Sequence, residues 1–220
     1  MSAQRIRVGV LGHGTVGSAF VDLVRRQAGT IAARSGVQLE IARVAVRNVA
    51  NHKDSAVADL LTTDADFVVN DPTIDVIVEV MGGVDDARRL ILQAISNGKP
   101  VITANKALLA THGVELFTAA DASGIDLLFE AAVCGGIPLI RPLRESLRGE
   151  PITRVLGIVN GTTNYILTKM TEESMTYGDA LAGAQKLGYA EADPTADVEG
   201  HDAAAKLSII ASIAFGQNVV

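Results

Sequence analysis

Short segments of apolar, β-branched residues alternate with segments of helical periodicity over roughly the first 135 residues. A helix is predicted over residues 15–27, because Val16, Phe20, Leu23 and Val24 recur at the spacing of one helix face. The other elements expected here are strands at residues 5–11, 38–46, 73–80, 99–103 and 126–133 and helices at residues 86–96 and 106–122. Strands that alternate with helices in this way predict an α/β fold with a parallel sheet and right-handed crossovers.

The pattern changes after residue 137, where helices follow one another and a single strand is expected. We predict helices at residues 137–147, 162–172, 178–187 and 199–215, and a strand at residues 152–159. The chain is therefore expected to divide into a first domain, residues 1–137, and a second, α+β domain, residues 138–220. A lone strand has no neighbour to pair with. We therefore expect the second domain to be incomplete, through truncation of the chain or pairing with a partner subunit.

A glycine-rich turn joins the first predicted strand to the first predicted helix. Residues 12–17 read Gly-His-Gly-Thr-Val-Gly, which is a G-x-G-x-x-G motif. Gly12 allows the tight turn, Gly14 lets the backbone approach a pyrophosphate, and Gly17 lets the helix pack on the strand. The helix N-terminus offers free N–H groups to the phosphates. In this position the motif predicts a dinucleotide site in a Rossmann-type, doubly wound sheet, whereas alone it would indicate only a glycine-rich turn.

The end of the second predicted strand bears on the choice between NAD and NADP. An NAD site usually has Asp or Glu there to bind the ribose 2′-hydroxyl. This chain has Arg47 and Asn48, and its next acidic residue is Asp54. Arg47 can pair with a 2′-phosphate, which favours NADP, and Lys53 is a weaker candidate for the same phosphate. A solvated surface arginine is the alternative interpretation, so both cofactors stay open.

Composition and charge exclude several classes of protein. The 220 residues carry a formal charge of −6, with 48% hydrophobic and 4% aromatic residues and no Trp. A broad basic face and aromatic stacking platforms are therefore not expected, which argues against a nucleic-acid partner. No apolar run is long enough for a transmembrane helix, and residues 1–4 do not resemble a signal peptide. The single cysteine, Cys134, excludes an internal disulfide, and we expect a cytoplasmic protein.

Closely spaced carboxylates and a lysine lie near the C-terminal end. Asp202 and Lys206 are four residues apart and so share a helix face. A carboxylate beside a lysine can orient the lysine for proton transfer. On spacing alone, a surface ion pair is the simpler interpretation. Glu191, Asp193 and Asp197 could likewise belong to a solvated loop, and they match no recognised spacing for a divalent metal site.

Five stretches of the sequence closely resemble the homoserine dehydrogenase family, in the order in which that family has them. They cover most of the chain, and the last two are highly specific. The stretches are VGVLGHGTVG (8–17), VITANKALLATHG (101–113), FEAAVCGGIPLIRPLRESL (129–147), GIVNGTTNYIL (157–167) and LGYAEADPTADVEGHDAAAKLSIIA (187–211). The resemblance implies interconversion of L-homoserine and L-aspartate 4-semialdehyde with NADP or NAD, in threonine, methionine and isoleucine biosynthesis.

The resemblance also implies roles for residues of the last stretch. Lys206 is the expected proton donor to the carbonyl oxygen during reduction, and Asp202 would orient it and contact the substrate. Glu191 would hold the ammonium group of the amino-acid substrate, with Gly188 beside it. Asp197 would support the same site.

Further implied residues lie in the first domain and at its end. Lys106, at the carboxyl end of a predicted strand, would lie near the nicotinamide and the substrate. The expected cofactor-binding residues are Gly12, Gly14, Thr15, Val16, Gly17, Arg47, Gly82 and Lys106. A monovalent cation such as sodium would bind, mostly through main-chain carbonyls, at Glu130, Val133, Gly135 and Ile137. Members of the family form homodimers through the substrate-domain sheet, and they are longer than this chain. The sequence therefore leaves open whether this chain alone catalyses the reaction and whether it forms a dimer.

Two other functions stay open. A dehydrogenase for a related semialdehyde or amino acid would have the same cofactor half, although Glu191, Asp202 and Lys206 argue against it. A nucleotide-binding fragment or sensor without turnover is the second alternative, and the length of the chain supports it.

Overall fold

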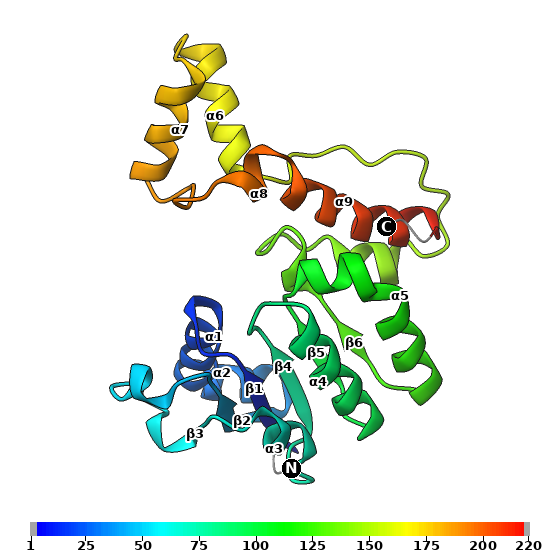
Figure 1. Ribbon diagram of the computed structural model, residues 1–220. Helices are drawn as coiled ribbons and strands as arrows, with labels where there is room; N and C mark the ends of the chain where they lie inside the picture. Colours follow the sequence, from blue (N-terminus) through cyan, green and yellow to red (C-terminus); the bar gives the residue numbers. More distant parts are fainter. Residues whose placement is uncertain (1–3, 218–220) are drawn as a thin grey trace. The chain divides into compact units, whose positions relative to one another are not determined.

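The computed structural model describes residues 4–217. By its internal contacts the chain divides into two compact units, Met1–Ala132 and Val133–Val220. Figure 1 shows the elements of both units.

A parallel sheet forms the centre of the first unit, which confirms the predicted α/β class. Within residues 4–217 it has six strands in the order β3-β2-β1-β4-β5-β6, and every neighbouring pair is parallel. The strands are β1 (Gln4–Leu11), β2 (Val37–Ala45), β3 (Leu61–Thr62), β4 (Val76–Glu79), β5 (Val101–Thr103) and β6 (Leu127–Leu128). The chain runs outward from β1 to β3 and then returns to the other side of β1, so the sheet is doubly wound.

Two groups of helices cover this sheet (Figure 1). One group is α1 (Thr15–Arg26) and α2 (Ala28–Ser35), which contact each other and β2. The other is α3 (Ala65–Asn70), α4 (Asp85–Ser96) and α5 (Lys106–Ser123), in which α4 contacts both neighbours. Because the direction of winding reverses after β3, right-handed crossovers place the two groups on opposite faces of the sheet.

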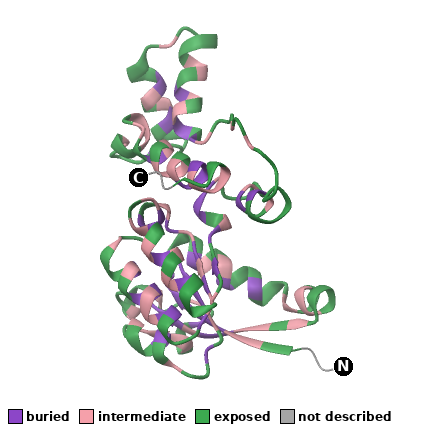
Figure 2. Cartoon of the chain, turned by 90° about the vertical axis from the view of Figure 1, so that its right-hand side faces the viewer, coloured by how far each residue is buried: buried purple, intermediate pink, exposed green. Residues whose placement is uncertain are grey.

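The core of the first unit lies between the sheet and these helices (Figure 2). Val8 and Val10 of β1 are buried with Val44 of β2, and Val21 of α1 packs into the same cluster. The first residues of β1 are exposed, whereas Val8 to Leu11 are buried. The carboxyl end of β1 is thus held firmly in the core, and the glycine-rich turn begins directly after it.

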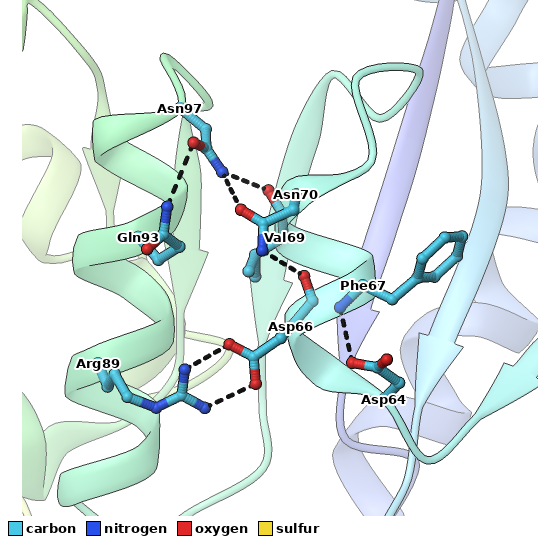
Figure 3. A network of polar contacts seen from close by, with 8 residues as sticks. All are labelled: Asp64, Asp66, Phe67, Val69, Asn70, Arg89, Gln93 and Asn97. Atoms are coloured by element: carbon cyan, nitrogen blue, oxygen red, sulfur yellow. Dashed lines mark hydrogen bonds and ion pairs between the residues drawn. The ribbon is translucent and has the colours of Figure 1, made fainter.

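Polar contacts join α3 to α4 (Figure 3). The guanidinium of Arg89 binds both carboxylate oxygens of Asp66, and these hydrogen bonds lower the pKa of the Asp66 carboxyl. At the other end of the two helices, the amide of Asn97 donates to the carbonyl of Val69 at 2.9 Å and to Oδ1 of Asn70 at 2.8 Å. Both ends of the short helix α3 are thereby fixed to α4.

The described part of the second unit is helical. Its helices are α6 (Gly161–Glu172), α7 (Tyr177–Lys186), α8 (Thr195–Val198) and α9 (His201–Phe215). Helices α6 and α7 pack around Ile166, Ala180 and Ala184, and Ala190 joins this cluster. Asn160 caps α6 and Thr176 caps α7, each accepting a hydrogen bond from a backbone N–H of the first turn.

Three predicted elements differ in the structure. Residues 152–159 were expected to form a strand, but they are irregular, and Leu156 and Ile158 are exposed. The described part of the second unit offers no strand for pairing, and an unpaired strand is not stable. The strand predicted at 126–133 is only the two-residue β6, followed by a 3-10 turn at Glu130–Ala132. The helix predicted at 137–147 is reduced to a short π-helical segment at Pro142–Ser146, which begins at a proline.

Among residues 4–217, four short α-helices or strands had not been predicted. They are α2, β3, α3 and α8. None is longer than eight residues, so none carries enough repeats of an apolar pattern to be recognised from the sequence.

Candidate active site and cofactor-binding pocket

The glycine-rich turn has the geometry that a phosphate-binding turn requires. Gly12 has a φ of 104°, and its N–H donates to the carbonyl of Ala45 at 2.9 Å. A Cβ atom at Gly14 would meet nothing within 4 Å, so this backbone is open to a ligand. A Cβ atom at Gly17 would lie 2.2 Å from the carbonyl oxygen of Gly12. Gly17 is therefore needed mainly because it lets α1 lie close to the backbone of the turn. It also allows close contact between α1 and the side chain of Val80, which follows β4.

A pocket of about 1010 Å³ opens at the carboxyl ends of β1 to β4. Most of its lining comes from the ends of these four strands and the loops that follow them, and the first turns of α4, including Arg89, complete it. It lies where the winding of the sheet reverses, which is the usual ligand position in an open α/β sheet. Its volume is at the upper end of the range for small-molecule sites, as a dinucleotide requires.

Four of the predicted cofactor-binding residues line this pocket: Gly12, Gly14, Arg47 and Gly82. Arg47 is exposed at the end of β2, where it was expected. Thr15, Val16 and Gly17 do not line the pocket but form the first turn of α1, whose N–H groups follow Gly14. Lys106 is the first residue of α5, after β5, and is also outside the lining.

His13 and His52, which the motif analysis did not single out, also line the pocket. The His13 side chain is buried, and its Nε2 lies 2.9 Å from Oγ of Ser55. Its Nδ1 has no hydrogen-bond partner within residues 4–217. Burial, and secondarily the neighbouring His52, lowers the pKa of His13, while Asp22 opposes this shift. Position 13, inside the G-x-G turn, is the only sequence signal that could have pointed to this residue.

A buried carboxylate joins the loops that follow β4 and β5. Glu79 is 0% exposed. Its Oε1 accepts from the N–H of Met81 at 2.9 Å, and its Oε2 accepts from Oγ1 of Thr103 at 2.6 Å. Thr103 Oγ1 in turn accepts from the N–H of Asn105, whose amide donates to the carbonyl of Gly83. The backbone on either side of Gly82 and the residue before Lys106 are thus fixed together.

In the second unit, Lys206 and Asp202 form an ion pair on α9. Nζ of Lys206 lies 2.6 Å from Oδ2 of Asp202 and 2.7 Å from the carbonyl oxygen of Val159. The side chain of Asp202 is 8% exposed and that of Lys206 is 17% exposed. The pair is thus more buried than an ordinary surface ion pair, which is solvated. Asp202 also lies in the first turn of α9, where the helix dipole favours a carboxylate.

The side chain of Asn160, which the sequence analysis did not name, contacts this pair. Its Nδ2 donates to Oδ2 of Asp202 at 2.8 Å and to Oδ1 of Asp197 at 2.7 Å. Asp197 lies on α8, so the buried amide connects three segments of the unit. Its partners are distant in the sequence, and only its place directly before Gly161, in the NGTTNYI stretch, could have drawn attention to it.

Comparison with known proteins assigns both units. The family model for the NAD-binding domain of homoserine dehydrogenase matches residues 12–130, and the model for homoserine dehydrogenase matches residues 138–220. The chain belongs to the homoserine dehydrogenase family. The sequence resemblance is thereby confirmed.

Individual homoserine dehydrogenases agree with this assignment. The enzyme of Mycobacterium leprae is 54% identical over 98% of this chain, and that of Corynebacterium glutamicum is 49% identical over 97%. The crystal structure from Thiobacillus denitrificans has a TM-score of 0.93 at 49% identity and covers 99% of this chain. A hyperthermophilic archaeal homoserine dehydrogenase in complex with NADPH has a TM-score of 0.84 at 28% identity over 98% of this chain.

The matches also show that the family's proteins are longer. The chain spans 49% and 48% of the Mycobacterium leprae and Corynebacterium glutamicum enzymes, 50% of the Thiobacillus denitrificans structure and 71% of the archaeal one. The chain therefore corresponds to about half the length of its curated relatives.

The other substrate residues expected for a homoserine dehydrogenase lie in or near the loop between α7 and α8. Gly188, with a φ of 76°, follows the C-cap residue of α7, and the carbonyl of Tyr189 accepts a hydrogen bond from Oγ1 of Thr162 at 2.6 Å. The Glu191 side chain is exposed. Its backbone carbonyl accepts from the Gln185 amide at 3.2 Å, which holds the loop to α7. Asp197 is engaged by Asn160, as described above.

The residues expected at a monovalent cation site fall on both sides of the division between the two units. Glu130 belongs to the first unit, and Val133, Gly135 and Ile137 belong to the second. In the second unit, Cys134 has a φ of 52° and Gly136 a φ of 84°, and the N–H of Ile137 donates to the carbonyl of Cys134. The carbonyls of Val133, Gly135 and Ile137 accept no hydrogen bond from the described residues.

Residues 4–217 contain no cluster of three or more His, Cys, Asp or Glu side chains arranged to hold a metal ion. Nor do they include a helix with the length and hydrophobicity that crossing a bilayer demands.

Proposed function

We propose that this chain carries the cofactor-binding and catalytic residues for the interconversion of L-homoserine and L-aspartate 4-semialdehyde with NADP(H) or NAD(H). The observation that supports this most strongly is the buried Lys206–Asp202 pair. It lies in the family's most specific sequence stretch, in a unit that the homoserine dehydrogenase model matches. The glycine-rich turn and the pocket beside it support the nucleotide part of the proposal.

Lys206 is proposed to donate a proton to the substrate's carbonyl oxygen during reduction. Two N–H groups of the ammonium bind Asp202 and the carbonyl of Val159. The third has no partner within the described part of the chain, so it can reach a substrate oxygen. Asp202 keeps the amine charged and oriented, and a proton moves from Nζ to the developing alkoxide. The bound nicotinamide supplies or accepts the hydride.

Recognition of an amino-acid substrate requires a negative group for its ammonium. Glu191 is the proposed residue, because its exposed carboxylate has no hydrogen-bond or ion-pair partner among residues 4–217. The hydrogen bond from the Gln185 amide to the backbone carbonyl of Glu191 holds the loop that carries this carboxylate in place. Gly188 and Asp197 are proposed to complete the substrate site.

In the first unit, the pocket is proposed to hold the dinucleotide. Gly12, Gly14 and the first turn of α1 would bind the pyrophosphate, and Gly82 would contact the nucleotide from the loop after β4. Arg47 would bind a 2′-phosphate, which favours NADP over NAD. Lys106, at the start of α5, would act near the nicotinamide. The described contacts of Glu79 support this arrangement because they hold the backbone around these residues.

Further features are proposed for the complete protein on the strength of family membership. They are a monovalent cation such as sodium, bound by carbonyls near Glu130, Val133, Gly135 and Ile137, a homodimer, a cytoplasmic location, and a role in threonine, methionine and isoleucine biosynthesis. Among the described residues, nothing donates a hydrogen bond to the carbonyls of Val133, Gly135 and Ile137, and oxygens are the preferred ligands of such a cation.

The test is homoserine-dependent reduction of NADP and of NAD, followed by the absorbance of the reduced nicotinamide, on this chain and on Lys206→Ala. Activity that the variant loses, with nucleotide binding retained, supports the proposal and shows the cofactor preference. Oxidation of a related amino-acid alcohol in preference to homoserine would contradict the proposed substrate.

Nucleotide binding without turnover is the second candidate. The observation that favours it is the length of the chain, about half that of its curated relatives. A titration of the chain with NADPH, in parallel with the activity assay, distinguishes the two. Binding with no homoserine oxidation would establish the second candidate for this chain.

A further inference from the structure

The amide of Asn160 uses its full hydrogen-bonding capacity inside the second unit. Its two N–H groups donate to Asp197 and Asp202, and its Oδ1 accepts from the N–H of Thr163 at 2.8 Å and from Oγ1 of Thr163 at 2.9 Å. An asparagine side chain offers two donors and two acceptor positions. All four are therefore occupied, and the side chain is held from both ends.

The orientation of this amide follows from its partners. The two groups on one side are carboxylates, which only accept when ionised, and the Thr163 backbone N–H on the other side can only donate. The nitrogen must therefore face Asp197 and Asp202. A flipped amide would place its oxygen against two carboxylates and its N–H groups against an N–H.

This orientation makes Asn160 a neutral bridge between two acidic residues. Asp197 comes from α8 and Asp202 from α9, and each binds a different N–H of the same nitrogen. Oδ2 of Asp202 accepts from both the amide and the ammonium of Lys206. The amide thus fixes the rotation of the carboxylate that holds the amine.

The backbone beside Asn160 contacts the amine directly. The carbonyl of Val159 accepts from Nζ of Lys206 at 2.7 Å. Residues 159 and 160 therefore bind both members of the pair, one through a carbonyl and the other through an amide. As a result, the position of the capped start of α6 is coupled to the direction of the remaining N–H of Lys206.

We propose that Asn160 is a positioning residue for the reaction, which acts through Asp202 on the proton donor Lys206. This inference rests on the proposed function of Lys206. An ordinary helix cap would need only the contacts of Oδ1 with Thr163. The two bonds from the nitrogen go to acidic residues outside α6 and are not explained by capping.

Two substitutions separate capping from positioning. Asn160→Asp and Asn160→Ser both retain an acceptor that can cap α6. Asn160→Ser is neutral and too short to bridge the carboxylates. Asn160→Asp has the shape of asparagine but loses both donors and adds a carboxyl group beside Asp197 and Asp202. Thr176→Ala, which removes the cap of α7, is the control for lost helix capping.

The first readout does not depend on turnover. Competitive labelling of lysines with acetic anhydride, resolved by peptide mass spectrometry across a pH series, follows the reactivity of Lys206. We expect Asn160→Asp to lower the labelling of Lys206 at a given pH severalfold, because the carboxyl group added beside Asp202 holds the amine more tightly. We expect Asn160→Ser to increase the labelling of Lys206 at a given pH, because the amine is less well held. Thr176→Ala should leave the labelling curve of Lys206 unchanged.

The second readout is the split between kcat and KM in homoserine oxidation. A loss of alignment should lower kcat by about tenfold to hundredfold in both Asn160 variants, with KM for homoserine changed by less than about threefold. Labelling curves that coincide with wild type in both variants would overturn the positioning role, even if thermal stability falls. If the wild-type chain is inactive, the proposed turnover fails for this chain, and the labelling still decides the role of Asn160.

Discussion

Oγ1 of Thr103, at the end of β5, donates a 2.6 Å hydrogen bond to Oε2 of Glu79, a completely buried residue at the end of β4. Thr103→Val would keep the shape of the side chain while leaving this carboxylate oxygen and the N–H of Asn105 without their partner. We expect a loss of about 1–3 kcal/mol in the free energy of unfolding, because buried polar groups become unsatisfied. Urea unfolding followed by circular dichroism measures it.

The matched control is Thr118→Val. Thr118 is exposed on α5, and its hydroxyl bonds only to the carbonyl of Val114 in its own helix. Its replacement should change stability by no more than about 0.5 kcal/mol. Equal effects of the two substitutions would show that the Glu79 contact does not contribute to stability.

Gly14 and Gly17 should respond to alanine in opposite ways. Alanine at position 17 would place its Cβ against the carbonyl of Gly12, so Gly17→Ala should cost about 1–3 kcal/mol or prevent folding. Alanine at position 14 has open space, so Gly14→Ala should cost less than about 1 kcal/mol. Its methyl group would nevertheless stand where the pyrophosphate approaches, and we expect the Kd for NADPH to rise at least about tenfold.

Thermal unfolding and a fluorescence titration with NADPH measure both effects on the same samples. Unchanged NADPH affinity in a folded Gly14→Ala variant would show that the nucleotide does not approach this backbone. A fully stable Gly17→Ala variant would show that the turn can shift away from the added atom.

The fold of the first unit was predictable because its signals are local. Each long helix carries several apolar repeats, and the turn at residues 12–17 lies between a strand and a helix, as its motif requires. The strand expected at residues 152–159 shows the limit of this reasoning. Its sequence has the character of a strand, but a strand also needs a neighbour, and the described part of the second unit has none.

The sequence pointed to the charged residues of the candidate site but not to the hydrogen bonds that join them to distant parts of the chain. The spacing of Asp202 and Lys206 indicated a pair, and the structure added its burial, which spacing cannot show. Asn160 contacts residues that are 37 and 42 positions away, and Glu79 contacts Thr103 across 24 positions. No periodic pattern brings such residues together, because their proximity is a property of the folded chain.

Replacement of Arg47 should separate the two cofactors. Arg47 is exposed at the edge of the pocket, and a guanidinium there can form an ion pair with the 2′-phosphate of NADPH, a group that NADH lacks. We expect Arg47→Ala to raise the Kd for NADPH about tenfold to hundredfold and the Kd for NADH by less than about threefold. Arg34→Ala, at an exposed position on α2 outside the pocket lining, should change neither. Equal loss of both nucleotides would contradict a role in 2′-phosphate binding.

His13 should make the stability of the chain depend on pH. Burial, followed by the proximity of His52, lowers the pKa of His13 below its usual value of 6.5 in the folded chain. The unfolded chain therefore binds more protons at this residue, and stability increases with pH through the window from the folded pKa to about 6.5. Above pH 6.5 the His13 ring is neutral in both the folded and the unfolded chain, and this residue does not reduce the free energy of unfolding. As the pH falls below 6.5, the free energy of unfolding decreases, because the unfolded chain takes up a proton that the buried ring does not.

A His13→Gln variant tests this dependence without a titrating group at position 13. Its free energy of unfolding should fall less than that of wild type when the pH is lowered from about 7.5 to about 5.5. Urea unfolding at each pH gives the two slopes, and the difference between them isolates the contribution of His13 from that of other groups. Equal slopes would mean that the ring is protonated as readily in the folded chain as in the unfolded one. The proposed nucleotide site beside His13 leads to one further expectation. Saturating NADPH should make the free energy of unfolding of the wild-type chain less dependent on pH, because a bound phosphate favours the charged ring.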